Sequence, residues 1–322
     1  MDQEAAAPAA PLHPPDGTVH EGVPYASADR LAAELAAPLG QALAAGEPVV
    51  AVLDRDNRAA LSAALGTAAA DVEWLDPTEV HRVPAFTIAM RWARLTRRTT
   101  RPEQRTTVVA QHAELPGIDR GHWARLDAGL TVALAHLPIT MLCACPETGD
   151  LELLRATHPT LRMGGTSLPA GPMRDPVQLV AEFPPPPPVD LGPPATEMPF
   201  TVDTLAAVRR LVAETAPRAG LDPEHTADLV LAVNEIATNS VEHGPGAGVL
   251  RMWGRERPGA VAEVYDVGSM DVPFPGMVPP PPSGKRGRGL WLASELTDVL
   301  QVWSDDSGTT VRLFVDGPDR GE

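Results

Sequence analysis

The chain of 322 residues is poor in lysine, cysteine and aromatic side chains, and each shortage excludes a class of protein. Its one lysine is Lys285 and its net charge is −16, so it lacks the cationic surface that nucleic-acid phosphates require. Two cysteines exclude a disulfide-held scaffold and favour the cytoplasm as the compartment. No apolar run approaches the roughly 18 residues of a membrane span, and we expect neither a span nor a secretory signal.

Proline is in excess, with 36 residues beside 27 glycines, yet 43% of the chain is hydrophobic, which is enough to form cores. The prolines should therefore be concentrated in a few segments. Residues 183–199 contain five consecutive prolines, which favour an extended polyproline II spacer, and less strongly a ligand for SH3-type domains. We predict a disordered tail over 1–18, a first domain over 19–182, this linker over 183–199, and a second domain over 200–317.

The first domain alternates short apolar runs with helical patterns, which predicts a mostly parallel α/β sheet. The loop after the first run, residues 54–58, has two carboxylates and neither glycine nor lysine, so it is unsuited to phosphate. The Walker pattern G-x-x-x-x-G-K-[ST] is absent from the chain, which argues against nucleotide chemistry in this domain. The predicted strands are 49–53, 72–75, 107–110 and 139–144, and the predicted helices are 58–65, 86–96 and 121–136.

Two cysteines, Cys143 and Cys145, lie two positions apart in the last of these predicted strands. They could form a redox or metal sensor, because alternate strand positions face the same side. A metal site usually needs four ligands, however, and no second Cys/His pair stands at a useful spacing, so we favour buried small apolar residues. We likewise interpret the scattered histidines as ordinary core or surface residues; they are His81, His112, His122 and His158.

Several stretches of this half resemble the MEDS sensory domain, a degenerate relative of the RecA/KaiC-like ATPases. They are the sequence HEGVPYAS, the run VVAVL with its following turn, LPITMLCACP, and THP at 157–159. The resemblance covers about residues 19–180 and implies a signal-input domain with a RecA/KaiC-like parallel sheet. It implies no particular ligand.

The second domain contains a long amphipathic helix predicted over residues 223–243. Gly220 ends the preceding helical segment, Asp222 is suited to the N-cap, and Pro223 to the first helical position. One polar stripe contains Glu235 and Asn239, which the helical repeat places one turn apart, together with Asp228 and Glu242. Asparagine oxygen can bind Mg²⁺, and a nearby carboxylate can orient or deprotonate a nucleophile.

Glycine-containing motifs follow this helix in a definite order. The predicted strand 261–265 ends in Asp266-Val267-Gly268, where a carboxylate could accept a hydrogen bond from an adenine amine. A loop over 269–286 carries six prolines, and Gly287-Arg288-Gly289-Leu290 then opens a predicted helix that ends at Leu296. Backbone N–H groups at such a helix start favour phosphate. A strand over 308–315 closes the domain.

This order resembles the GHKL (Bergerat-fold) ATPases: E-x-x-x-N, D-x-G, a lid, G-x-G and a closing G-T strand. The sequences NEIATNSVEHG and GRGLWLASELTD are most similar to the anti-sigma factor serine kinases of the RsbW/SpoIIAB type. The whole arrangement resembles the actinobacterial RsbA-family anti-sigma regulators of stress-response transcription. The resemblance implies an α/β sandwich that binds ATP and Mg²⁺. By residue, it implies Glu235 as general base, Asn239 as the Mg²⁺ ligand, Asp266 and Gly268 at adenine, Gly287, Arg288, Gly289 and Leu290 at the phosphates, and Thr310 near the adenine pocket.

The resemblance also implies partners: a sigma factor that the protein sequesters, and an anti-anti-sigma (STAS-type) antagonist whose serine it phosphorylates, with a possible homodimer. Two alternatives stay open. The domain could bind ATP without using it, or the chain could be a sensor histidine kinase. The second is disfavoured, because a proline-rich segment and one short helix stand where a dimerising hairpin would be. The sequence departs from the family pattern at the start of the lid, where D-V-G-S-M lacks a second glycine. The prolines Pro279–Pro282 predict a stiff or open lid.

Overall fold

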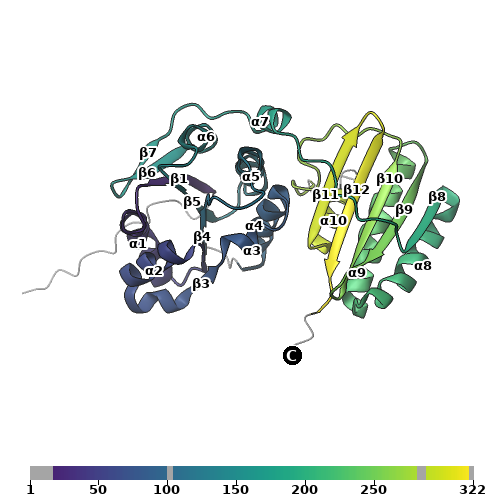
Figure 1. Ribbon diagram of the computed structural model, residues 1–322, viewed down its shortest axis with the longest axis horizontal. Helices are drawn as coiled ribbons and strands as arrows, with labels where there is room; N and C mark the ends of the chain where they lie inside the picture. Colours follow the sequence, from purple (N-terminus) through teal and green to yellow (C-terminus); the bar gives the residue numbers. More distant parts are fainter. Residues whose placement is uncertain (1–16, 100–103, 281–287, 319–322) are drawn as a thin grey trace, which may run out of the picture. The chain divides into compact units, whose positions relative to one another are not determined.

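The computed structural model of the protein describes residues 17–99, 104–280 and 288–318. Its internal contacts divide the chain into two compact units, one with a seven-stranded sheet and one with a five-stranded sheet (Figure 1). Nearly all of the predicted tail lies outside the described residues. Within the described residues, no helix combines the length and the apolar character needed to cross a membrane.

The seven-stranded sheet has the strand order β3-β2-β4-β5-β1-β6-β7. Neighbouring strands are parallel throughout, except that β7 runs antiparallel to β6. The predicted mostly parallel α/β sheet is therefore confirmed. The strands are β1 (Val19–Tyr25), β2 (Val49–Val52), β3 (Val72–Leu75), β4 (Thr106–Gln111), β5 (Ile139–Pro146), β6 (Thr160–Met163) and β7 (Thr166–Pro169).

The helices of the first half of the chain alternate with these strands. The segment after β2 differs from its prediction as a turn, because Asp54 accepts a hydrogen bond from the Asn57 N–H at 2.9 Å and caps a helix that begins at Arg55. The helices are α1 (Ala28–Ala44), α2 (Arg55–Leu65), α3 (Pro77–Val80), α4 (Ala85–Thr99), α5 (Arg120–Ala133), α6 (Leu151–Thr157), α7 (Pro176–Glu182) and a 3-10 turn, Gly66–Asp71.

One face of this sheet packs against α1 and α2 through an apolar core. Leu31, Leu35 and Leu39 recur at helical spacing along α1 and are completely buried, as is Leu61 of α2. They meet β-strand side chains that alternate toward the same face, such as Val23, Leu142 and Ala144. Residues of β1 and β5 with the opposite parity, His20 and Cys143 among them, therefore point to the other face.

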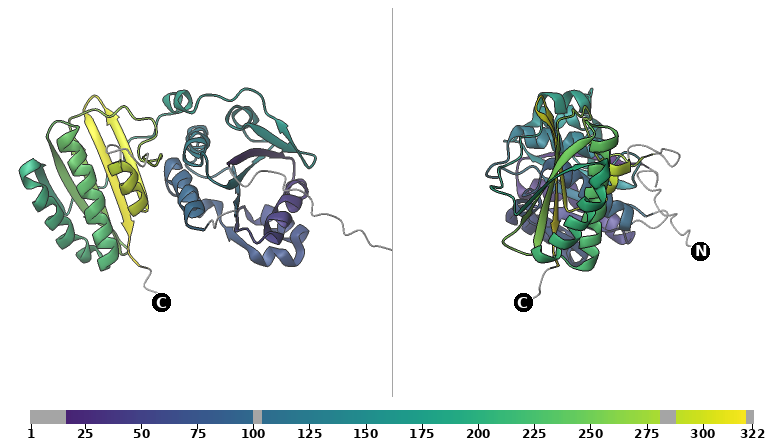
Figure 2. Two further views of the ribbon diagram at one scale, coloured as in Figure 1. Left: turned by 180° about the vertical axis from the view of Figure 1, so that it is seen from behind. Right: turned by 90° about the vertical axis from the view of Figure 1, so that its right-hand side faces the viewer.

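The five-stranded sheet is antiparallel, with the order β11-β12-β10-β9-β8. Three helices, α8, α9 and α10, lie together on one of its faces (Figures 1 and 2), and their apolar side chains join those of the strands in one core. This two-layer α/β sandwich confirms the predicted fold class. Its elements are β8 (Thr196–Thr201), α8 (Leu205–Thr215), α9 (Pro223–Glu242), β9 (Ala247–Gly254), β10 (Gly259–Asp266), α10 (Arg288–Leu296), β11 (Val299–Asp305), β12 (Gly308–Asp316) and two 3-10 turns, Val202–Thr204 and Pro217–Ala219.

The proline-rich segment lies along the open face of the five-stranded sheet. The Arg312 guanidinium donates to the Val189 carbonyl at 2.8 Å, the Trp253 indole to Gly192 at 3.1 Å, and the Trp303 indole to Pro186. Strand β8 then begins at Thr196, inside the segment predicted as linker over 183–199. Proline leaves its carbonyl free to accept hydrogen bonds, so this rod is attached to the sheet by its carbonyl oxygens.

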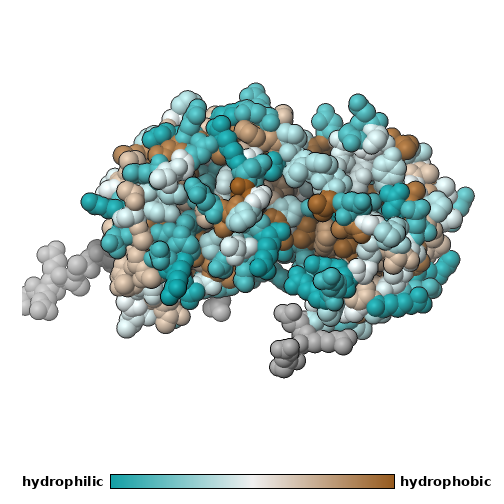
Figure 3. All heavy atoms as spheres, viewed as in Figure 1, coloured by the Kyte–Doolittle hydropathy of each residue, from teal (hydrophilic) through white to brown (hydrophobic). Residues whose placement is uncertain are grey.

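The surface is mainly polar. The face drawn in Figure 3 is covered mainly by hydrophilic and neutral residues, with smaller hydrophobic patches between them. Most of the leucine and isoleucine side chains lie in the cores, while a few large aliphatic residues such as Val189 and Val267 are exposed.

Candidate functional site

The site is built on α9, whose start and buried face follow directly from its sequence. The Asp222 carboxylate caps the helix by accepting a hydrogen bond from the His225 N–H at 2.8 Å, and Pro223 occupies the first turn. Leu229, Val233 and Ile236 are buried in the core. That burial fixes the rotation of the helix, so the predicted polar pair on its flank is held at the edge of the sandwich.

The structure brings Glu235 and Asn239 of α9 together with Gly289 of α10. A Cβ atom at position 289 would lie 3.0 Å from Asn239 Nδ2 and 3.3 Å from Glu235 Oε2. Gly289 is in the first turn of α10, which begins at Arg288. The predicted acid–amide pair therefore faces the N-terminal end of a helix, where backbone N–H groups and the helix dipole favour negative charge.

A second part of the site is formed where β10 ends. The Asp266 carboxylate accepts a hydrogen bond from the Gly268 N–H at 2.8 Å, so the chain turns tightly at the predicted D-x-G motif. A carboxylate accepts several hydrogen bonds, so Asp266 keeps acceptor capacity beyond this one. The Gly268 carbonyl in turn accepts from the Thr309 hydroxyl at 2.8 Å, which ties the turn to β12.

The cavity lining includes Thr309, whereas the predicted Thr310 is not part of it. Thr309 is in register with Asp266 on β10, and both line the cavity. Thr310 pairs with Tyr265 and Trp303, and the alternation of side chains along β12 turns it to the other face of the sheet. The sequence G-T-T contains two adjacent threonines, and only the alternation of side chains along β12 decides which of them faces the cavity.

These groups surround a cavity of about 260 Å³ between α9, α10 and the ends of β10 and β12. Its apolar wall includes Ile236 and Val311, beside the polar groups already described. Met270 and Val272, from the loop after β10, also line it and were not predicted. Of the predicted site residues, the cavity lining includes Asn239, Asp266, Gly268 and Leu290, while Glu235 adjoins it through Gly289.

The predicted phosphate loop and lid are described only in part. Gly287 and the second half of the Pro279–Pro282 run lie outside the described residues, and Arg288 is exposed at the start of α10. The described part of the lid is tied to its surroundings. The Met270 N–H donates to the Ser304 hydroxyl at 2.7 Å, and the Ser294 hydroxyl donates to the Gly276 carbonyl at 2.9 Å.

Part of the second unit matches a known protein family. Residues 198–315 match the family model described as the histidine kinase-like ATPase domain. The match begins within β8 and ends within β12, so it spans the whole sandwich and every motif of the cavity. Nucleotide binding is the property that this domain type implies.

The other comparisons add little. Among solved structures, the chain is similar to the RsbU and RsbW domains of Rv1364c from Mycobacterium tuberculosis, at 23% identity and a TM-score of 0.29. That alignment covers 38% of this chain and 32% of the other, so the chain spans about a third of the length of that structure. No curated protein matches the chain.

The described residues fit a nucleotide with a divalent cation. Gly289 leaves open the space that a Cβ would fill between α10 and the Asn239 amide. Asp266 offers an acceptor at the other end of the cavity, and Asn239 offers a neutral oxygen of the kind that Mg²⁺ accepts. The cavity thus has the Asn239 amide and the start of α10 at one end and the Asp266 carboxylate at the other.

Proposed function

We propose that the protein is an anti-sigma regulatory factor that uses ATP and Mg²⁺ to phosphorylate a serine of an anti-anti-sigma (STAS-type) antagonist, and that sequesters a sigma factor. In this proposal the N-terminal unit is a MEDS-like sensory input domain that controls the ATPase domain. The observation that carries the proposal is the convergence of Glu235, Asn239 and Gly289 at the start of α10, beside the cavity that Asp266 closes at its other end.

Each residue has a distinct task in this mechanism. Asp266 accepts a hydrogen bond from the adenine amine, and Gly268 keeps the adjacent turn open. The N–H groups at the start of α10, with Arg288 and Gly289, bind the phosphates. Asn239 supplies an oxygen ligand for Mg²⁺, which neutralises phosphate charge when it is bound.

Glu235 acts on the accepting serine. Its carboxylate takes the hydroxyl proton while the serine oxygen forms a bond to the γ-phosphorus. The bond between that phosphorus and the bridging oxygen breaks on the opposite side, and ADP leaves with the electron pair. Positioning supplies most of the catalysis in such a transfer, so the rigid attachment of Glu235 to the buried helix α9 is an advantage.

The proposal is tested with purified protein, γ-labelled ATP, Mg²⁺ and candidate antagonist proteins from the same cell. We expect label on a serine of one antagonist with the unaltered protein and with Glu224→Ala, an exposed glutamate in the first turn of the same helix. Glu235→Ala should retain ATP affinity within about twofold and lose transfer by at least about 100-fold.

The other outcomes identify the alternatives. Tight ATP binding without transfer to any antagonist would show a module that regulates its partners by binding alone. A label that is lost in acid but stable in alkali would indicate a phosphohistidine and a histidine kinase. Co-purification with a sigma factor tests sequestration separately from catalysis.

A further inference from the structure

A cysteine and two histidines meet on the face of the seven-stranded sheet opposite α1 and α2. His20 lies on β1 and Cys143 on the neighbouring strand β5, where Gly22 is in register with Cys143. Because His20 and Gly22 are two positions apart, the two side chains project from the same face. The His20 Nε2 atom lies 3.4 Å from the Cys143 Sγ atom.

His158 approaches the same point from the end of α6. Its Nδ1 atom lies 2.9 Å from the Leu154 carbonyl oxygen, and that hydrogen bond requires a proton on Nδ1. The neutral ring then presents Nε2 as a lone pair, which is the form in which histidine binds metals. The rings of His158 and His20 lie 4.2 Å apart between centroids.

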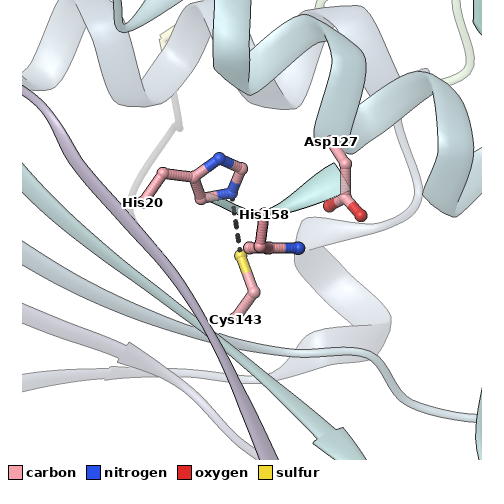
Figure 4. A group of neighbouring side chains, drawn as sticks. All are labelled: His20, Asp127, Cys143 and His158. Carbon is pink, nitrogen blue, oxygen red and sulfur yellow. Dashed lines mark hydrogen bonds between the residues drawn. The ribbon is translucent and has the colours of Figure 1, made fainter. Parts of the chain in front are cut away.

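These side chains converge on one small volume, shown in Figure 4. The ligand atoms of His20, Cys143 and His158 lie within 4.8 Å of one another. All three side chains are buried, and His20 is the most exposed at 7%.

We propose that His20, Cys143 and His158 bind a zinc-class divalent cation. A thiolate with two imidazoles suits a borderline-soft ion, and Mg²⁺ or Ca²⁺, which prefer all-oxygen sites, are disfavoured.

Cys145 provides a matched control within the same strand. It is two residues from Cys143, is equally buried at 1% exposure, and faces the same side of the sheet. Its sulfur lies 3.6 Å from the Pro146 carbonyl oxygen and is not among the grouped ligand atoms. Replacing Cys145 by serine should therefore change the packing of β5 as much as the same change at Cys143, without removing a ligand.

The test is a titration of the full-length, chelator-treated protein with Co²⁺, which reports a bound thiolate by its sulfur-to-cobalt absorption band. We expect the band in the unaltered protein and in Cys145→Ser, and its loss when Zn²⁺ is added. Cys143→Ser should not give the band. His158→Gln retains the thiolate but should weaken Co²⁺ binding by about 100-fold. If Cys143→Ser lacks the native circular dichroism spectrum and has therefore not folded, the His158→Gln variant provides the test.

Three results would overturn the proposal. The unaltered protein could give no band at stoichiometric Co²⁺, or Cys143→Ser could give the same band as the unaltered protein. Alternatively, iodoacetamide could alkylate Cys143 rapidly and equally with and without Zn²⁺, which would show that Zn²⁺ does not bind the Cys143 sulfur.

Discussion

Gly289 in the first turn of α10 packs closely against Asn239, because a Cβ atom at position 289 would lie 3.0 Å from the Asn239 Nδ2 atom. The two residues belong to different helices and different sequence motifs. Their contact places the acid–amide pair of α9 next to the G-x-G motif at the start of α10. The absence of a side chain at position 289 therefore determines where the Asn239 amide can lie.

We predict that Gly289→Ala weakens ATP binding by roughly tenfold, because the new Cβ atom would displace the Asn239 amide beside the cavity. Alanine within a helix should at the same time favour folding by about 1 kcal/mol. The ATP affinity measured by calorimetric titration should therefore fall, while the midpoint of thermal unfolding should rise. Gly254→Ala, where no atom lies within 4 Å of the new Cβ, is the control and should leave affinity unchanged. Equal affinities for all three proteins would show that Gly289 does not border the nucleotide.

Thr309 and Thr310 form a matched pair for the second prediction. Thr309→Val removes the hydroxyl that donates to the Gly268 carbonyl and leaves that carbonyl without this donor. An unsatisfied buried acceptor costs about 1–3 kcal/mol, so we expect ATP affinity to fall roughly tenfold. Thr310→Val changes the other face of the sheet and should alter affinity by less than about twofold. Competition with a fluorescent nucleotide measures both, and a larger effect at position 310 would contradict the assignment.

The C-terminal site was predictable because its information is local. Asp222 and Pro223 mark the start of α9, the apolar spacing of Leu229, Val233 and Ile236 orients it, and the observed helix Pro223–Glu242 ends one residue before its predicted end. The motifs then place glycines where backbone must come close. The choice between Thr309 and Thr310 depended on strand phase, which a short G-T-T sequence does not fix.

Other features depend on contacts between distant parts of the chain. His20 and Cys143 are separated by 123 positions, so no spacing rule could join them to one site. Strand β8 was hidden in a proline-rich segment, and the sheet tolerates Pro199 there because β8 is its edge strand. The attachment of the rod to the sheet likewise depends on Arg312, Trp253 and Trp303, whose partners are not encoded nearby.

The ion pair beneath that rod gives the third prediction. The Arg312 guanidinium donates to Glu263 Oε2 from Nε at 2.9 Å and from Nη2 at 2.6 Å, and both side chains are buried. Arg312→Gln leaves the Glu263 carboxylate in the sheet with Arg251 as its remaining cation. We expect the free energy of unfolding to fall by about 3 kcal/mol.

Denaturant unfolding followed by tryptophan fluorescence checks this, since Trp253 and Trp303 lie about 6.0 and 5.9 Å from the Arg312 guanidinium. Arg257→Gln is the control. Arg257 is exposed, and its nitrogen is 3.9 Å from Asp316, so the change should cost less than about 0.5 kcal/mol. Equal midpoints for the two variants would show that the buried pair contributes nothing.

The capping pair of α9 gives a pH-dependent prediction. Hydrogen bonds from the backbone and side chain of His225 lower the pKa of Asp222, and the bond to Asp222 raises the pKa of His225. The His225 contribution to stability is complete below the unfolded-state pKa, near 6.5, and is lost as the pH rises through the higher folded-state value. The Asp222 contribution is complete above its unfolded-state value, near 3.8, and is lost as the pH falls through the lower folded-state value.

The pair should therefore stabilise the protein most between about pH 4 and pH 6.5. We predict that His225→Gln lowers the urea midpoint more at pH 5 than at pH 9, because the imidazole of the unaltered protein loses its proton as the pH rises through its folded-state pKa. Asp222→Asn keeps a good N-cap but removes the charge, so it should lose the same pH 5 advantage while α9 stays capped. A His225→Gln effect of equal size at both pH values would mean that His225 acts through packing, because only an interaction with the charged imidazole disappears as the ring loses its proton.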